Sequence, residues 1–293
     1  MVGASSSQHV QRLELRLVPI IHAIVLGLVQ GLAEFLPISS SGHLLLVPWL
    51  FNWHDFDNTA IEKAFDVALH IGTLVAVVAY FRRDLVVYIR EGIKAALHRD
   101  QPPSPEGKLA WLLVLASIPA AIVGALFEKT IDNRLGKPWI IAVSLIVFGV
   151  LLGLSDRRSG QRGLPDYQRG DALKVGAAQV LSLNPGTSRS GITITAARYL
   201  GFTRDAAVRA SFLMAIPVTA GAIAYKMLKL AKDGVPHGLG VPMVVGIVTS
   251  AIAGWAAVWG TLRLIRTRSF MPFVIYRCTV GVAVLIIVAT NWR

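Results

Sequence analysis

A run of polar residues between Gln30 and His43 has the residue types and spacing of a phosphate- or metal-binding site. Gln30 and Glu34 are four residues apart, so they share one face if this segment is helical. Amide and carboxylate oxygens are ligands that Mg²⁺ prefers. Pro37 should end the helix, because it has no N–H and restricts the residue before it. The turn that follows would offer hydroxyls and backbone N–H groups to an anion. The residues of that turn are Ser39, Ser40, Ser41, Gly42 and His43.

A second cluster, between Asn184 and Thr193, places one arginine among small hydroxyl residues. Pro185 and Gly186 should break a helix, and an apolar run resumes after them. Arg189 would suit a pair of phosphate oxygens, because the donors of a guanidinium form a rigid fork. The positive end of the helix dipole of the half-helix that follows would attract the same phosphate. The other residues expected to contact an anion here are Gly186, Thr187, Ser188, Ser190 and Thr193.

Structural roles remain open for the same side chains. Glu34 could pair with a buried arginine or lysine, and the serines could cap helices. Arg189 could bond to carbonyls or to Glu34, and a pair with Glu34 would be compatible with catalysis. His43 alone would be typical of a hydrogen-bonded interior histidine. Asp66 and His70, spaced i and i+4 in an apolar run, are weaker candidates. Asp66 is expected to lie in the first turn of a helix, where its carboxylate would interact with the positive end of the helix dipole.

The remaining sequence indicates a membrane protein. Of its 293 residues 54% are hydrophobic and only 16% are charged, too few to cover a soluble domain of this length. Long apolar runs match a hydrocarbon layer of about 30 Å. These runs are 17–36, 65–81, 109–127, 139–154, 206–228, 241–262 and 272–290. We therefore expect an all-α polytopic membrane protein with a single integral membrane domain over residues 1–293, in which residues 1–16 form a polar N-terminal segment.

The net charge of +12 has a membrane explanation. In a soluble protein it would suggest a nucleic-acid partner, but the positive-inside rule accounts for it here. No basic stretch is interleaved with aromatic residues as a nucleic-acid platform requires. We expect membrane lipid, and no nucleic acid, as a partner. The lone Cys278 excludes an internal disulfide.

The two polar motifs belong to an internal repeat. Sliding the chain along itself aligns Gln30 with Gln179 and Ser39 with Ser188. Three apolar runs separate the two turns, so the second unit would enter the membrane from the opposite side. Such inverted-topology repeats place their site near the midplane, on broken helices that face each other. Chance similarity in a biased composition is the alternative. The two units would be residues 17–154 and 171–290.

Basic residues are unevenly divided between the expected loops. They gather in 82–99, 157–169 and 263–268, and the face that carries them should be cytoplasmic. Both chain ends and the first serine-rich turn would then lie toward the outside. Residues 85–97 are amphipathic and are expected to lie along the cytoplasmic surface.

Both motifs resemble those of the undecaprenyl-diphosphate phosphatases, also called bacitracin-resistance proteins. The first motif stands here as Gln30 to Glu34 and Pro37 to His43, and the second as Pro185 to Thr193. The resemblance implies six crossings with two re-entrant helix pairs in the bacterial cytoplasmic membrane, with the site facing outside. It implies hydrolysis of a polyprenyl diphosphate lipid, undecaprenyl diphosphate, to undecaprenyl phosphate and phosphate, with Mg²⁺ or Ca²⁺. This reaction recycles the lipid carrier for cell-wall synthesis. A homodimer is left open.

The same resemblance implies roles for single residues. Ser40 would be the nucleophile and His43 its acid–base partner, whereas Glu34, with Gln30, would bind metal or position water. Arg189 would hold the diphosphate, helped by the hydroxyls of the second motif, which are Ser188, Ser190 and Thr193. The sequence leaves open whether Ser40 attacks or His43 activates water.

Two rival functions are compatible with parts of this pattern. A transporter or flippase for the lipid phosphate would share the inverted repeat and the broken helices. A membrane phosphatase of the acid phosphatase type would share the Ser-Gly-His and Ser-Arg elements. That type needs a further histidine after the Ser-Arg element, and none occurs between Ser190 and Asp205. We therefore disfavour the second rival and keep the first.

Overall fold

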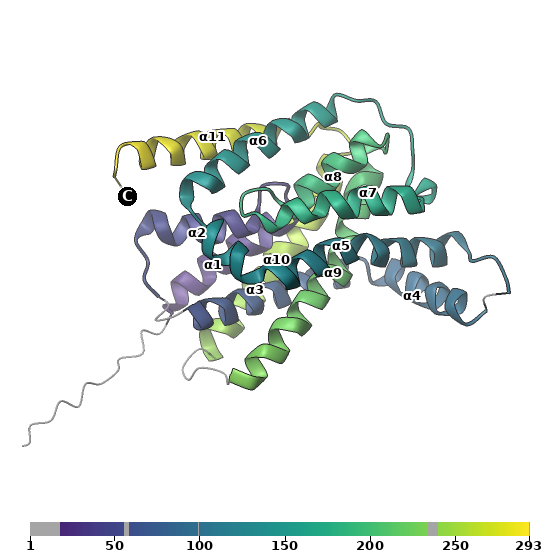
Figure 1. Cartoon of the computed structure of the whole chain (residues 1–293), viewed down its shortest axis with the longest axis horizontal. Coiled ribbons are helices and arrows are strands. Elements are labelled where there is room, and N and C mark those ends of the chain that lie inside the picture. The colour runs from purple at the N-terminus through teal and green to yellow at the C-terminus, as the bar shows by residue number, and fades with distance from the viewer. Residues whose placement is uncertain (1–17, 56–58, 99, 234–239, 293) are drawn as a thin grey trace, which may run out of the picture.

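The computed structural model describes residues 18–55, 59–98, 100–233 and 240–292. The polar segment predicted for residues 1–16 lies outside these residues. The α-helices are α1 (Ile20–Phe35), α2 (Ser40–Phe51), α3 (Thr59–Tyr80), α4 (Arg82–Leu97), α5 (Pro105–Arg134), α6 (Pro138–Asp156), α7 (Arg169–Val180), α8 (Arg189–Tyr199), α9 (Arg204–Asp233), α10 (Gly240–Leu264) and α11 (Met271–Ala289) (Figure 1). No strand element occurs in the described ranges, so the all-α prediction is confirmed.

The long helices are membrane spans. Helices α5, α6, α9, α10 and α11 are long and apolar enough to cross a bilayer, and α3 joins α4 in a pair bent by 84°. Helix α3 has 22 residues, which at about 1.5 Å each is one hydrocarbon thickness. The chain is therefore a multi-pass membrane protein with about six crossings. Helix α4 turns away from α3 with exposed valine and isoleucine side chains, as expected for a helix along the membrane surface.

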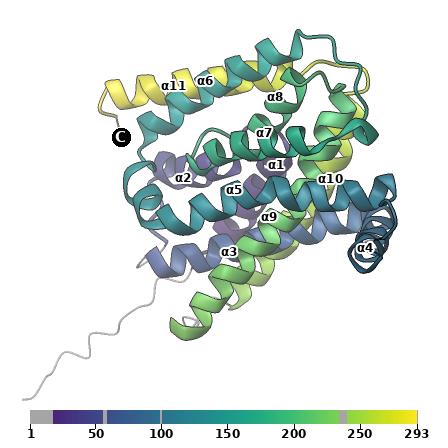
Figure 2. The same cartoon turned by 45° about the vertical axis from the view of Figure 1, so that its right-hand side comes forward.

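Two pairs of short helices lie inside this frame. In Figures 1 and 2, α1, α2, α7 and α8 lie between the α6–α11 pair and a group made of α3, α5, α9 and α10. Helices α1 and α2 have 16 and 12 residues, and α7 and α8 have 12 and 11, so each is too short to span by itself. Broken helices of this kind are tolerated at membrane depth where other helices surround them. The two re-entrant pairs are thus present.

The breaks inside the two pairs have the same local structure. Ser39 caps α2 with φ 81°, and Ser188 caps α8 with φ 73°. Each serine side chain accepts a hydrogen bond from the backbone N–H of the glycine three residues later. Positive φ is costly for a non-glycine residue and persists where the surroundings impose it. The pair of matching strained caps agrees with the internal repeat, while the boundaries of the two units stay a prediction.

Helices α3 and α10 approach so closely that a glycine is required between them. A Cβ added to Gly72 would lie 1.9 Å from Ser250 Oγ and 2.3 Å from the Ile247 carbonyl oxygen. Gly72→Ala should therefore push the helices apart and lower the stability by roughly 1–3 kcal/mol, seen as a lower melting temperature in detergent. Gly260→Ala, in α10, is the matched control, because its Cβ would meet nothing within 4 Å. Equal melting temperatures for the two variants would contradict this account.

Candidate functional site

The two serine-rich turns meet directly. Ser39 Oγ accepts a hydrogen bond of 3.1 Å from the backbone N–H of Gly186. Ser190 Oγ donates to the Leu36 carbonyl oxygen at 3.2 Å, so each turn is tied to the other. Gly42 lies at the same contact, where an added Cβ would be 3.2 Å from Gly186. The repeat thus brings the two motifs together, as the sequence predicted.

One buried arginine holds both turns in place. Arg277 of α11 is fully buried, and its Nη1 donates to the Pro37 carbonyl at 3.0 Å. Its Nη2 donates to the carbonyls of Gly186 and Thr187, both at 2.9 Å, and its Nε to that of Leu145 at 3.1 Å. Arg277 belongs to neither motif and was not among the predicted site residues. The available signal was an arginine inside the apolar run 272–290.

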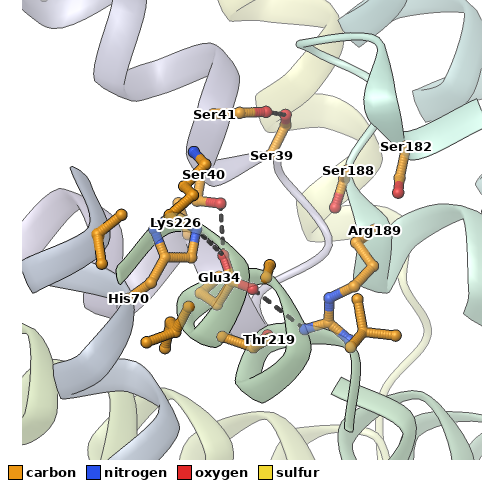
Figure 3. Close-up of a pocket in the computed structure, with 15 residues that line it drawn as sticks. Glu34, Ser39, Ser40, Ser41, His70, Ser182, Ser188, Arg189, Thr219 and Lys226 are labelled. Carbon is orange, nitrogen blue, oxygen red and sulfur yellow. Dashed lines mark hydrogen bonds and ion pairs between the residues drawn. The ribbon is translucent and has the colours of Figure 1, made fainter. Parts of the chain in front are cut away.

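A cavity of about 190 Å³ opens beside the joined turns. Its polar lining residues, labelled in Figure 3, are Glu34, Ser39, Ser40, Ser41, His70, Ser182, Ser188, Arg189, Thr219 and Lys226. Its apolar lining residues are Ala33, Val67, Val218, Ala222 and Ile223. The polar wall comes mainly from the two motifs, and the apolar wall comes from α1, α3 and α9. A cavity with these two walls suits a ligand that carries an anionic head and an apolar chain.

Glu34 is the centre of the polar wall. Its Oε1 accepts a hydrogen bond of 3.3 Å from Arg189 Nη2, and its Oε2 accepts one of 2.6 Å from Ser40 Oγ (Figure 3). Gln30 Nε2 donates to the same Oε2 at 3.2 Å, which agrees with the shared face predicted from their spacing. Arg189 Nη1 donates to the Ser211 carbonyl at 3.0 Å. The carboxylate, the guanidinium and a serine hydroxyl therefore converge in one cavity.

His43 does not line this cavity. Its Nδ1 lies 2.7 Å from the Ser39 carbonyl oxygen, and its Nε2 lies 2.9 Å from the hydroxyl of Tyr276. A carbonyl can only accept, so Nδ1 carries a hydrogen and Nε2 of the neutral ring accepts from the tyrosine. The imidazole thus supports the strained Ser39, whereas Glu34 is the group that meets Ser40. The geometry gives no support to the role of His43 as the acid–base partner of Ser40.

The hydrogen bond from Tyr276 gives a direct test of this arrangement. Tyr276→Phe should lower the stability by about 1 kcal/mol, the usual contribution of one hydrogen bond. It should change the rate of phosphate release by less than about tenfold, because the ring of His43 stays fixed through Ser39. Kinetics of the purified variant at substrate saturation provide the measurement. A loss as large as that of Glu34→Gln would instead place His43 in the chemistry.

The predicted substrate-contact residues divide into two groups. Ser39, Ser41 and Ser188 lie in the cavity wall. Those behind the wall are Gly42, Gly186, Thr187, Ser190 and Thr193. Thr193 Oγ1, for example, lies 2.8 Å from Ser211 Oγ and bonds to the Arg189 carbonyl. The second group therefore supports the residues that line the cavity.

Helices α3 and α9 contribute wall residues that the motifs did not indicate. His70 Nε2 lies 4.0 Å from Glu34 Oε2, and its Nδ1 lies 2.7 Å from the Asp66 carbonyl oxygen. The i, i+4 spacing of Asp66 and His70 had marked this segment, but only as a weaker candidate. Asp66 lies well inside α3, so its expected place in the first turn is wrong. Lys226 and Thr219 of α9 had no motif to identify them.

A divalent cation would find few protein ligands here. No group of three or more His, Cys, Asp or Glu side chains that could hold a metal occurs in the described part of the chain. Glu34 supplies a carboxylate, and Gln30 Oε1 is buried without a hydrogen-bond partner. Gln30 itself is fully buried behind Glu34. This set fits a Mg²⁺ site of the kind that takes one carboxylate from the protein and its other oxygens from phosphate and water.

Comparison with known proteins identifies the family. The family model described as bacitracin resistance protein BacA matches residues 23–283, which include both motifs and every residue that lines the cavity. The chain belongs to the bacitracin resistance protein BacA family. Its relatives include undecaprenyl-diphosphatases from Pelobacter propionicus (46% identical over 93% of this chain and 98% of the relative) and Geobacter sulfurreducens (48% identical over 91% and 97%). A third relative of the same name, from Trichlorobacter lovleyi, is 44% identical over 91% of this chain and 96% of its own length.

Proposed function

We propose that this protein hydrolyses undecaprenyl diphosphate to undecaprenyl phosphate and inorganic phosphate, which recycles the lipid carrier for cell-wall synthesis. The observation that carries the proposal is the hydrogen bond of 2.6 Å from Ser40 to Glu34, within a cavity that also holds Arg189. Phosphoryl transfer needs a nucleophilic hydroxyl, a base and a group that binds the phosphate, such as a guanidinium. The names of the relatives point to the same reaction.

The contacts suggest how the protein's own residues would act. Ser40 Oγ attacks the terminal phosphorus while Glu34 Oε2 takes the hydroxyl proton, and Arg189 stabilises the charge on the transferred phosphoryl. The Oγ–P bond forms, the anhydride bond breaks, and undecaprenyl phosphate leaves. Water then attacks the phosphoserine, so that its oxygen forms the new bond to phosphorus and both of its protons leave with the inorganic phosphate. As the Oγ–P bond breaks, Glu34 returns the proton to Ser40. His43 takes no proton in this scheme and holds the turn through Ser39.

Mg²⁺ or Ca²⁺ is the proposed cofactor. Glu34 and the free amide oxygen of Gln30 would hold it, together with oxygens of the diphosphate and water. The bound cation would supply further neutralisation of the phosphate charge. Because both oxygens of Glu34 already accept hydrogen bonds, Gln30 and Ser40 would have to adjust when the ion binds.

We also propose that the site faces the outside of the bacterial cytoplasmic membrane. The basic loops 157–169 and 263–268 follow α6 and α10, and the start of α9 lies at the same end of the bundle (Figure 1). Lys226, in the cavity wall, lies near the opposite end of α9. The cavity therefore lies toward the end with fewer basic residues, which the positive-inside rule assigns to the outside.

Phosphate release by the purified protein in detergent tests the function. Wild type should release phosphate from undecaprenyl diphosphate, a chelator should stop it, and Mg²⁺ or Ca²⁺ should restore it. Glu34→Gln should lose roughly 10²-fold or more of the rate, because the base is gone. A flippase, the alternative function, would release no phosphate under these conditions. A folded wild-type protein that releases none with either ion would refute the proposal.

A further inference from the structure

One cationic side chain in the cavity has no role in the reaction described above. Lys226 of α9 is half-buried and lines the cavity together with Thr219 and Ile223. It has no hydrogen bond or ion pair within the residues that the structure describes. A lysine near the end of a membrane helix would ordinarily extend its ammonium toward water. An ammonium that instead lines a cavity without a counter-ion is a candidate for binding an anion.

Lys226 and Arg189 reach the cavity from different ends. Arg189 donates a hydrogen bond to the carbonyl of Ser211. Ser211 precedes Lys226 on α9, and the two lie about 22 Å apart along the helix axis at ~1.5 Å per residue. Figure 3 shows the two side chains on opposite sides of Glu34. Ser40 and Arg189 bond to the two different oxygens of the Glu34 carboxylate, which places the terminal phosphoryl group beside that carboxylate. The cation at the other end is then left for a second anionic group.

The apolar surroundings indicate which anionic group that is. Val67, Val218, Ala222 and Ile223 form the apolar wall, and the last two lie within the turn of α9 that precedes Lys226. Beyond Lys226, the α9 side chain of Leu228 is 68% exposed on the surface of a helix that spans the membrane. An apolar chain that leaves the cavity along α9 would pass beside Lys226. The phosphoryl group attached to that chain would be the one closest to the ammonium.

We propose that Lys226 binds the phosphoryl group that is attached to the prenyl chain, while Arg189 and Ser40 act on the terminal one. This inference rests on the proposed function and adds a second anion subsite to it. Since the chain-attached phosphoryl stays on the lipid product, Lys226 is a binding group for both the substrate and the prenyl monophosphate. Inorganic phosphate, the other product, would bind at the Arg189 end instead.

Product inhibition separates the two subsites. Lys226→Met should raise the inhibition constant of farnesyl phosphate, a short prenyl monophosphate, by roughly tenfold or more, as expected for the loss of a charged hydrogen bond. The inhibition constant of inorganic phosphate should stay within about twofold of the wild-type value, because inorganic phosphate would bind at the Arg189 end. Lys226→Arg should keep the wild-type values. Lys94→Met, which removes an exposed lysine of α4, is the control for a change in net charge.

A binding measurement makes the test independent of catalysis. Farnesyl phosphate should raise the melting temperature of wild type and of Lys94→Met, and this increase should be lost in Lys226→Met. If wild type released no phosphate but kept this Lys226-dependent increase, the subsite would stand while the proposed reaction failed. Equal effects of Lys226→Met on farnesyl phosphate and inorganic phosphate, or no effect on either, would overturn the subsite. Lys226→Gln provides a second variant if the methionine variant elutes as an aggregate.

Discussion

Arg189→Lys is expected to lower the rate of phosphate release by roughly 10³-fold or more, the usual contribution of an arginine to phosphoryl transfer. The guanidinium uses Nη2 for Glu34 and Nη1 for the carbonyl of Ser211, so its plane is held by two partners on different helices. A lysine keeps the charge but has one nitrogen, which cannot keep both contacts and also bind two phosphate oxygens. The turnover number of the purified variant at saturating substrate measures the effect.

The matched control for this substitution is Arg209→Lys. Arg209 also pairs with a carboxylate, through a hydrogen bond of 2.9 Å to Asp205 one turn earlier on α9, but it does not line the cavity. Its lysine variant should hydrolyse the substrate at nearly the wild-type rate, because a lysine can keep a single, partly exposed ion pair. Near-wild-type hydrolysis by Arg189→Lys as well would remove Arg189 from the role given to it.

Arg277→Met is expected to have the largest effect on stability. The substitution leaves the carbonyls of Pro37, Gly186 and Thr187 buried without their donor, at about 1–3 kcal/mol for each. Several kcal/mol is a large part of the stability of most domains. The two motif turns should separate, so hydrolysis should be lost together with stability. Thermal unfolding in detergent and phosphate release on the same preparation measure both losses.

Two further variants separate the charge of Arg277 from its shape. Arg277→Lys keeps a buried cation but has fewer donors in a different geometry, so it should melt between wild type and Arg277→Met. Arg266→Met removes an exposed arginine from the loop between α10 and α11 and should melt like wild type. A wild-type melting temperature for Arg277→Met would show that the carbonyls find other donors and that the turns do not depend on this residue.

The sequence by itself determined the membrane architecture and the two motifs. A helix that spans a bilayer needs about twenty mostly apolar residues, so long apolar runs indicate the spans. Pro37 and the Pro185–Gly186 pair then mark the breaks, because proline has no N–H for a helical hydrogen bond and glycine readily takes a positive φ, as Gly186 does at 93°. Local geometry also follows from spacing, as the hydrogen bond between Gln30 and Glu34 shows.

Only the tertiary structure decided which side chains share the cavity. His43 follows Ser40 closely in the sequence, yet the rotation of α2 directs it to Tyr276, while His70 and Lys226 arrive from α3 and α9. The role of Arg277 depends in the same way on contacts between α11 and two distant turns. Helical periodicity relates residues three or four apart. The rotation and packing of separate helices come from the surfaces of all their neighbours together, which no single segment specifies.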